Sequence, residues 1–190
     1  DDSTRTDWGD LLTDVFHFAW AEGTQSNESF NAATDVSQAT LDLMDDYDRG
    51  VWIDLGDGND TVVGSAYGDN ISLGVGVSFI DGQANSGETP WGEKAGDTLE
   101  VYTTDDSQTV SVTPSDVNGY EYKVTVSGTG AVGYIKNIEG INVQLWEDKN
   151  GNGQRDWYED PSQNEVTYQQ FIPLALSVGE VRLDPNDSDR

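Results

Sequence analysis

Apolar and polar residues alternate along most of this chain, and a period of two predicts β-strands. The longest such run covers residues 70–80 and predicts a single long strand. Shorter runs predict strands, in chain order, at 15–20, 51–55, 99–103, 109–113, 120–127, 131–134, 142–146, 165–170, 171–178 and 180–183. Residues 34–47 have apolar positions that suit a short helix. Short strands divided by Gly, Pro and Asn turns predict an all-β fold, a β-sandwich with at most one or two short helices.

One connection between predicted strands has the ligand spacing of a twelve-residue EF-hand calcium loop. Residues 148–159 read Asp-Lys-Asn-Gly-Asn-Gly-Gln-Arg-Asp-Trp-Tyr-Glu, with oxygen-bearing side chains at positions one, three, five and nine, Gly at six and Glu at twelve. Position seven contributes its backbone carbonyl, so the predicted ligands are Asp148, Asn150, Asn152, Gln154, Asp156 and Glu159. The alternative is a solvated turn, which such residues also form. The preceding strand pattern, and Pro161 after the loop, predict a calcium loop between strands instead of between helices.

A second calcium motif occupies residues 56–62. Their sequence, Gly-Asp-Gly-Asn-Asp-Thr-Val, follows the pattern G-x-G-x-D-x-U of the calcium-binding repeats of RTX proteins. The glycines allow a turn that directs carbonyl oxygens toward a cation, and the aspartate supplies a carboxylate. The predicted metal site of this turn therefore contains Gly56, Gly58 and Asp60.

Two less regular copies of this motif follow. Asp69 stands nine residues after Asp60, although other residues replace the glycines of the motif there. Residues 81–85 and 96–101 together resemble a third turn, divided by the insert 86–95. These copies add Asp69, Asp81 and Asp97 as candidate calcium ligands. The fold is therefore expected to be calcium-stabilised, with several Ca²⁺ ions.

The divided turn also holds the candidate ligand-binding residues, which are Gln83, Asn85 and Trp91. Asp81, Gln83 and Asn85 have the one-three-five spacing of oxygen ligands in a calcium loop. Trp91 stands between Pro and Gly in the insert, and binding residues concentrate on loops held by a rigid scaffold. The alternative is that the Trp91 ring packs back against the core.

Composition restricts the partners of the protein. The chain has 190 residues with 36 acidic and 9 basic side chains, giving a formal net charge of -27. Such a chain cannot neutralise phosphates, which excludes nucleic acid and anionic membrane surfaces as partners. Aromatic residues make up 10% of the chain and supply core material, which argues against disorder. There is no Cys and no apolar run of membrane-spanning length, so a single folded domain that needs divalent metal is expected.

These motifs together resemble modules of the giant RTX adhesins of Gram-negative bacteria. Residues 133–143, Gly-Tyr-Ile-Lys-Asn-Ile-Glu-Gly-Ile-Asn-Val, followed by the 148–159 loop and residues 157–161, look like the peptide-binding domain of those adhesins. The resemblance implies one ligand-binding module, residues 1–190, of a larger adhesin, with 184–190 as a linker or tail. It also implies type I secretion to the bacterial cell surface and attachment to host or neighbouring cells, as in biofilms. The module would be monomeric and bind a peptide segment of a surface protein, with calcium helping to bind the ligand's carboxylate.

Three other functions remain open. A calcium-dependent, lectin-like module would use the same metal with Trp, Tyr and Asn side chains to bind sugar. A structural spacer would use calcium only to stiffen the adhesin, although six Trp residues and irregular inserts argue against it. An enzyme is not expected, because the chain lacks Cys and an H-E-x-x-H motif, and His17 is its single histidine.

Overall fold

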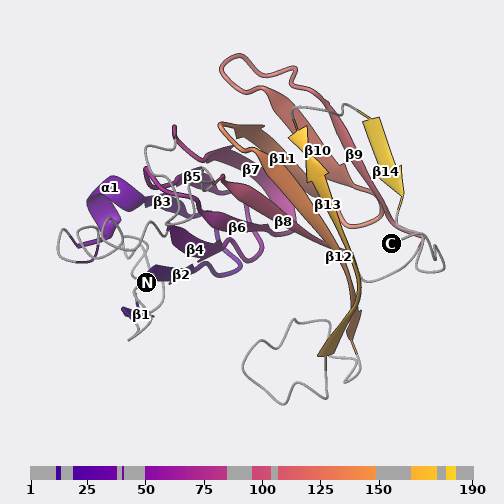
Figure 1. Ribbon diagram of the computed structural model, residues 1–190, viewed down its shortest axis with the longest axis horizontal. Helices are drawn as coiled ribbons and strands as arrows, with labels where there is room; N and C mark the ends of the chain where they lie inside the picture. The colour runs from indigo at the N-terminus through magenta and orange to yellow at the C-terminus, as the bar shows by residue number, and fades with distance from the viewer. Residues whose placement is uncertain are drawn as a thin grey trace.

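The computed structural model describes residues 12–13, 19–37, 40, 50–84, 96–103, 107–148, 164–174 and 179–182. Its strands form two seven-stranded sheets (Figure 1), in the orders β1-β2-β4-β6-β8-β12-β13 (sheet A) and β14-β9-β10-β11-β7-β5-β3 (sheet B). The strands of sheet A are β1 (Leu12–Thr13), β2 (Ala19–Glu22), β4 (Val51–Asp54), β6 (Asn70–Leu73), β8 (Thr98–Thr103), β12 (Gly140–Asp148) and β13 (Asn164–Pro173). Those of sheet B are β3 (Ser29–Asn31), β5 (Thr61–Val63), β7 (Gly76–Asp81), β9 (Thr109–Pro114), β10 (Tyr122–Val126), β11 (Ala131–Lys136) and β14 (Gly179–Arg182).

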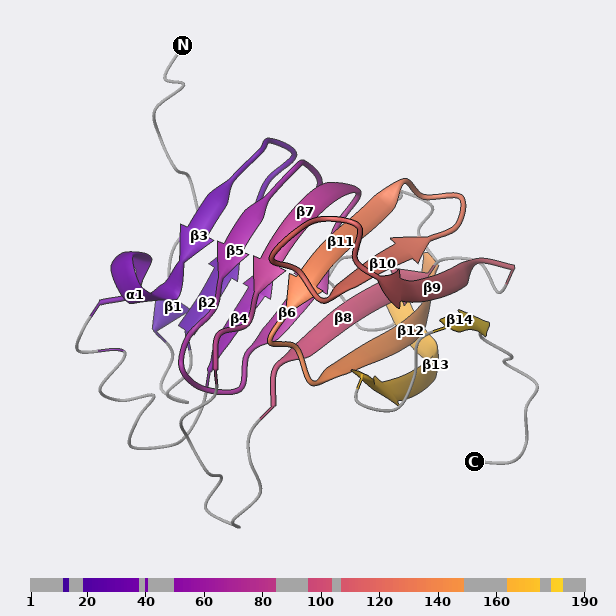
Figure 2. The same cartoon turned by 90° about the horizontal axis from the view of Figure 1, so that it is seen from above.

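From β2 to β8 the chain winds as a parallel coil, placing successive strands alternately in sheet A and sheet B. The strands β3, β5, β7 and β11 lie side by side and point the same way (Figure 2). Trp52 pairs with Asn70 and Thr61 with Phe79, so one turn of the coil takes eighteen residues here, or two nonapeptides. Antiparallel strands extend the coil, with β13 added to β12, and with β10, β9 and β14 added to β11.

The prediction of an all-β β-sandwich is wrong, and its stabilisation by calcium stays a prediction. Seven of the twelve strand pairs in the described residues are parallel, and the short helix α1 (Ala32–Asp35) precedes β4. The architecture is thus a mixed one, two sheets that each combine parallel and antiparallel strands, with a helical turn, instead of a sandwich of antiparallel hairpins. Alternation of apolar residues reports which face of a strand is buried, but it carries no information about the direction of the neighbouring strand.

The predicted single strand at 70–80 is also wrong, because the chain changes sheets in its middle. It forms β6 in sheet A and β7 in sheet B, joined by Gly74 and Val75. A Cβ at residue 74 would lie 1.3 Å from the carbonyl oxygen of Gly56 in the turn below, and Gly76 has a φ of +131°. The glycines therefore allow a tight crossing between sheets, and Val75 is 46% exposed instead of buried.

The core lies between the two sheets and is made of the inward-facing residues of both. Its largest fully buried aliphatic side chains come from both sheets and include Ile53, Leu55, Ile71, Ile80, Leu99, Ile135 and Ile141. Lateral stacking places similar residues above one another, as where Ile53 pairs with Ile71 and Ile71 with Leu99. This continuous apolar column holds the turns at the sheet ends in a fixed register.

Other sequence predictions fall near their observed elements. Pro173 lies on β13, the edge strand of sheet A, as predicted. The predicted strand at 165–170 and the first three residues of the one at 171–178 belong to a single strand, β13, while 175–178 lie outside the described residues. Of the predicted helix 34–47, residues 34–35 belong to α1, and 38–39 and 41–47 lie outside the described residues. Among the described residues, no helix is both long enough and apolar enough to span a bilayer.

Candidate functional site

A pocket of about 590 Å³ lies where β7 and β11 of sheet B end and β8 and β12 of sheet A begin. We call it the Asp97 pocket. Its lining combines carboxylates, amides, a hydroxyl and an aromatic ring, from Gln83, Ala84, Gly96, Asp97, Thr98, Asn137, Glu139, Gly140, Phe171 and Pro173. Four separate segments of the chain therefore meet there. Parallel stacking brings three of them together, and the antiparallel pairing of β13 with β12 adds the fourth.

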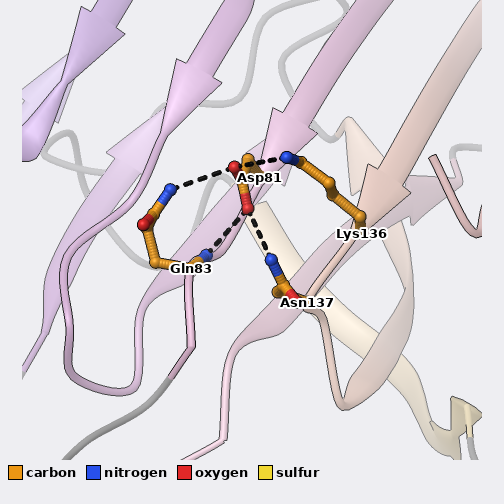
Figure 3. Close-up of polar contacts among 4 residues, drawn as sticks. All are labelled: Asp81, Gln83, Lys136 and Asn137. Carbon is orange, nitrogen blue, oxygen red and sulfur yellow. Dashed lines mark hydrogen bonds and ion pairs between the residues drawn. The ribbon is translucent and has the colours of Figure 1, made fainter. Parts of the chain in front are cut away.

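One wall of the pocket is held by four residues in contact with one another (Figure 3). We call them the Asp81 cluster, which consists of Asp81, Gln83, Lys136 and Asn137. The Asp81 carboxylate accepts hydrogen bonds from the Gln83 backbone N–H at 3.1 Å, from Gln83 Nε2 at 3.0 Å and from Asn137 Nδ2 at 2.8 Å. Lys136 Nζ forms an ion pair with Asp81 Oδ2 at 2.7 Å. Burial acts to raise the pKa of Asp81, but these donors outweigh it and lower the pKa below its usual value.

Both amide residues of the cluster have a strained backbone. Gln83 has a φ of 72° and Asn137 a φ of 53°, and they are the two non-glycine residues with positive φ in the described part of the chain. This conformation costs about 1–2 kcal/mol per residue and persists where surrounding contacts enforce it. Since both residues donate to Asp81 and both line the pocket, the Asp81 cluster holds this wall in a fixed shape.

The acidic residues of the pocket belong to a chain of hydrogen bonds that runs across the N-terminal ends of neighbouring strands in sheet A. Glu139 Oε2 accepts the Asp97 backbone N–H at 2.6 Å. Asp97 Oδ1 accepts the Asp69 N–H at 2.7 Å, and Asp69 Oδ1 accepts the Val51 N–H at 2.6 Å. Each carboxylate thus binds the backbone of the preceding turn of the coil. Asp97 is fully buried while Glu139 is exposed, so the pocket has one deep and one accessible carboxylate.

The apolar side of the pocket is formed by the end of β13. Phe171 is 58% exposed, one of three exposed large hydrophobic residues among those described. Its ring covers Gly140, where a Cβ would lie 2.2 Å from the Phe171 Cζ atom. Pro173 pairs with Gly140 across the two strands. An exposed aromatic ring fixed against backbone is a suitable contact for a ligand.

The predicted calcium turn at 56–62 has the expected backbone form. Gly56 and Gly58 both have positive φ, 63° and 135°. Asp60 is fully buried, and its Oδ1 accepts the Glu28 N–H at 2.9 Å, while Oδ2 lacks a hydrogen-bond partner among the described residues. Burial, with a smaller effect from the charges of Glu28 and Asp57, raises the Asp60 pKa to about 6. A buried carboxylate with an unused oxygen fits a cation ligand, so Gly56, Gly58 and Asp60 fit the predicted site.

The other candidate ligands in this region have different surroundings. Asp69 is buried and both its oxygens accept hydrogen bonds, from Val51 and from the Ser65 N–H and hydroxyl. Asp81 is paired with Lys136, which leaves it poorly suited to a metal. Within the described residues, no group of three or more His, Cys, Asp or Glu side chains is arranged to hold a metal ion.

The EF-hand-type loop lies between strands, as predicted. β12 ends at Asp148 and β13 begins at Asn164, and these two residues pair with each other. The predicted ligands Asn150, Asn152, Gln154, Asp156 and Glu159 lie outside the described residues, as do Asn85 and Trp91. The structure places Gln83 and Asp97 in one pocket, and it places Asp60 in a separate turn of the coil.

The buried carboxylates predict an unusual pH dependence in metal-free protein. Burial raises the pKa values of Asp60 and Asp69 to about 6 from 3.8, so between pH 4 and 6 the folded state binds more protons than the unfolded state. Their contribution to stability therefore increases as pH falls through 6. In EDTA, we expect the melting temperature of wild type relative to Asp60→Asn to rise by about 3–6 °C between pH 7 and pH 4.5. Asp116→Asn, at an exposed site, should show no such change. A constant difference between wild type and Asp60→Asn would contradict the assignment.

The sequence pattern does not predict four residues of this region, which are Lys136, Asn137, Glu139 and Phe171. The first three belong to the 133–143 segment that carries the family resemblance, where they fall around the turn between β11 and β12. Their proximity to Gln83 and Asp97 follows from the parallel pairing of β11 with β7 and of β12 with β8. Strand direction was the missing information.

The chain was compared with protein-family models, curated proteins and solved structures. None of the three comparisons gives a match.

Proposed function

We propose that this protein is a calcium-dependent peptide-binding module of a bacterial surface adhesin. The observation that supports this best is the Asp97 pocket, which combines hydrogen-bonding groups with an exposed aromatic ring on a rigid set of turns. Pockets of this kind, with a few convergent polar groups and an apolar wall, are typical ligand sites. The pocket volume of about 590 Å³ suits a few residues of a peptide instead of a folded partner.

Calcium in this proposal has a mainly architectural role. Asp60 in the 56–62 turn and the ligands of the 148–159 loop would hold Ca²⁺, which neutralises part of the charge of -27. The 148–159 loop connects β12 to β13, and the same two strands contribute Gly140, Phe171 and Pro173 to the pocket. Metal binding would thus fix the pocket wall and make peptide binding depend on calcium. An extracellular location at the cell surface, where Ca²⁺ reaches millimolar concentrations, suits this dependence.

A peptide array with free chain ends, read in 2 mM CaCl₂ and in EDTA, tests this function. Peptides that bind in calcium should lose affinity in EDTA. The variant Phe171→Ala should bind them about tenfold or more weakly, because an exposed aromatic contact removed from an interface costs on the order of 1–2 kcal/mol. Since Phe171 is 58% exposed, its removal should leave the fold intact, as checked by circular dichroism.

Val75→Ala is the matched control, since Val75 is also exposed but is absent from the pocket lining. It should bind as wild type does. Equal peptide binding with and without calcium would reject the proposal, and so would unchanged binding by Phe171→Ala. Binding to a glycan array but not to peptides would support a lectin-like module instead.

A further inference from the structure

We propose that the Asp97 pocket binds a cationic group of the peptide, its amino terminus or a Lys or Arg side chain. In this proposal Asp81 positions the Gln83 and Asn137 side chains, which help the pocket to prefer a cation. The inference rests on the proposed peptide-binding function and specifies the chemical class of group that the pocket accepts. It also gives Asp81 a role different from the metal-ligand role that its sequence context predicts.

The direction of hydrogen bonding in the Asp81 cluster determines whether this wall offers hydrogen-bond donors or acceptors to a ligand. Gln83 Nε2 and Asn137 Nδ2 both donate to Asp81, at 3.0 and 2.8 Å. Figure 3 shows the nitrogen of each amide facing Asp81 and the oxygen turned away from it. An amide whose nitrogen is held in this way offers its carbonyl oxygen to a ligand. Both amides therefore contribute hydrogen-bond acceptors to the pocket that they line.

The rest of the lining also offers hydrogen-bond acceptors. It includes the acidic residues Asp97 and Glu139 and the hydroxyl-bearing Thr98, and the described residues that line the pocket include no Lys, Arg or His. Lys136, the nearest cation on the Asp81 cluster, is held on Asp81 Oδ2 at 2.7 Å and is not part of the lining. An anionic ligand group would meet oxygen acceptors and negative charge here, whereas an ammonium or guanidinium group would meet complementary partners.

Phe171 completes a site for such a group. Cations bind favourably over aromatic rings, and the aliphatic part of a Lys or Arg side chain packs against the same surface. The net charge of -27 also raises the local concentration of cationic ligands. The pocket thus offers acceptors on one side and an aromatic ring on the other.

Calorimetry with two matched tripeptides tests the inference, using the full chain in 2 mM CaCl₂. Gly-Phe-Gly amide has a free amine and no carboxylate, whereas N-acetyl-Gly-Phe-Gly has a free carboxylate and no amine. The amine peptide should bind at least tenfold more tightly. Its affinity should fall about tenfold in Glu139→Gln, and it should fall with increasing salt.

Variants of the Asp81 cluster separate positioning from charge. Asp81→Asn removes an anion that lies outside the lining and releases the strained amides, so amine-peptide affinity should fall about tenfold. Lys136→Met keeps Asp81 and its amide partners, so affinity should stay equal or rise. In ¹⁵N spectra, the side-chain NH₂ signals of Gln83 and Asn137 should shift in Asp81→Asn and persist in Lys136→Met.

The outcomes distinguish this inference from the function on which it rests. Tighter or equal binding of the acetylated peptide would overturn the cationic preference while leaving peptide binding intact. Failure of both tripeptides, while longer array peptides bind, would also overturn it. Absence of any peptide binding on the array would reject the proposed function itself.

Discussion

Chelation of calcium with EDTA should lower the melting temperature of this protein by more than about 10 °C at pH 7. A ligand at one hundred times its dissociation constant stabilises a fold by about 2.7 kcal/mol per site, and 1 kcal/mol shifts the midpoint by about 2–4 °C in a chain of this size. Two sites are expected, one at Asp60 and one in the 148–159 loop. Asp60 is fully buried, and its Oδ2 has no hydrogen-bond partner among the described residues, so removal of a cation would leave a buried charge uncompensated. The net charge of -27 also opposes compaction.

Matched variants test which residue produces the calcium-dependent gain in melting temperature. Asp60→Asn should lose about half of the calcium-dependent gain in melting temperature, yet it should be at least as stable as wild type in EDTA, because it removes a buried charge. Asp57→Asn, in the same turn but exposed, should keep the full gain. Differential scanning calorimetry with and without 2 mM CaCl₂ makes the comparison. A wild-type melting temperature that EDTA leaves unchanged would end both the metal assignment and the calcium-dependent function.

Gly74→Ala should destabilise the protein by at least about 3 kcal/mol, measured by urea denaturation in calcium. The added Cβ would lie 1.3 Å from the Gly56 carbonyl oxygen, and this atom belongs to the backbone of the neighbouring turn. Rotation of a side chain cannot relieve such a contact, so the crossing from β6 to β7 has to move away from the 56–62 turn. The change should also weaken calcium binding at Asp60, because the two turns pack together.

Gly133→Ala is the appropriate control for this substitution. Its Cβ would lie 3.3 Å from the Leu73 Cδ1 atom, the end of a flexible side chain that can shift. The expected loss is about 1 kcal/mol or less. Equal losses in the two variants would show that the chain does not cross between sheets at Gly74.

The positions of the strands were predictable from the sequence because burial depends on local alternation. Residues 51–55, 99–103 and 131–134 fall on β4, β8 and β11. The pairing of those strands was not predictable, because a segment with alternating apolar residues can pair with a parallel strand as well as with an antiparallel one. Gly74 fits the alternating strand pattern of residues 70–80, but the need for glycine there comes from the backbone of Gly56, eighteen residues earlier.

The candidate site, too, was predictable from the sequence only in part. Gln83 and Asp97 were predicted to be functional from their spacing within one divided motif. Asn137, Glu139 and Phe171 lie far from that motif in sequence and reach the pocket only through the pairing of β11, β12 and β13. The polarity of the wall depends on the side-chain contacts of Asp81, which no sequence spacing specifies.

The insert 86–95 falls between β7 and β8, yet the register of sheet A is unchanged across it, since Ile71 still pairs with Leu99. A coil of this kind can therefore lengthen at one turn without disturbing the apolar column that stabilises it. Evolution, or a protein engineer, can replace the residues between Ala84 and Gly96, which both line the pocket, while the folded scaffold is inherited unaltered.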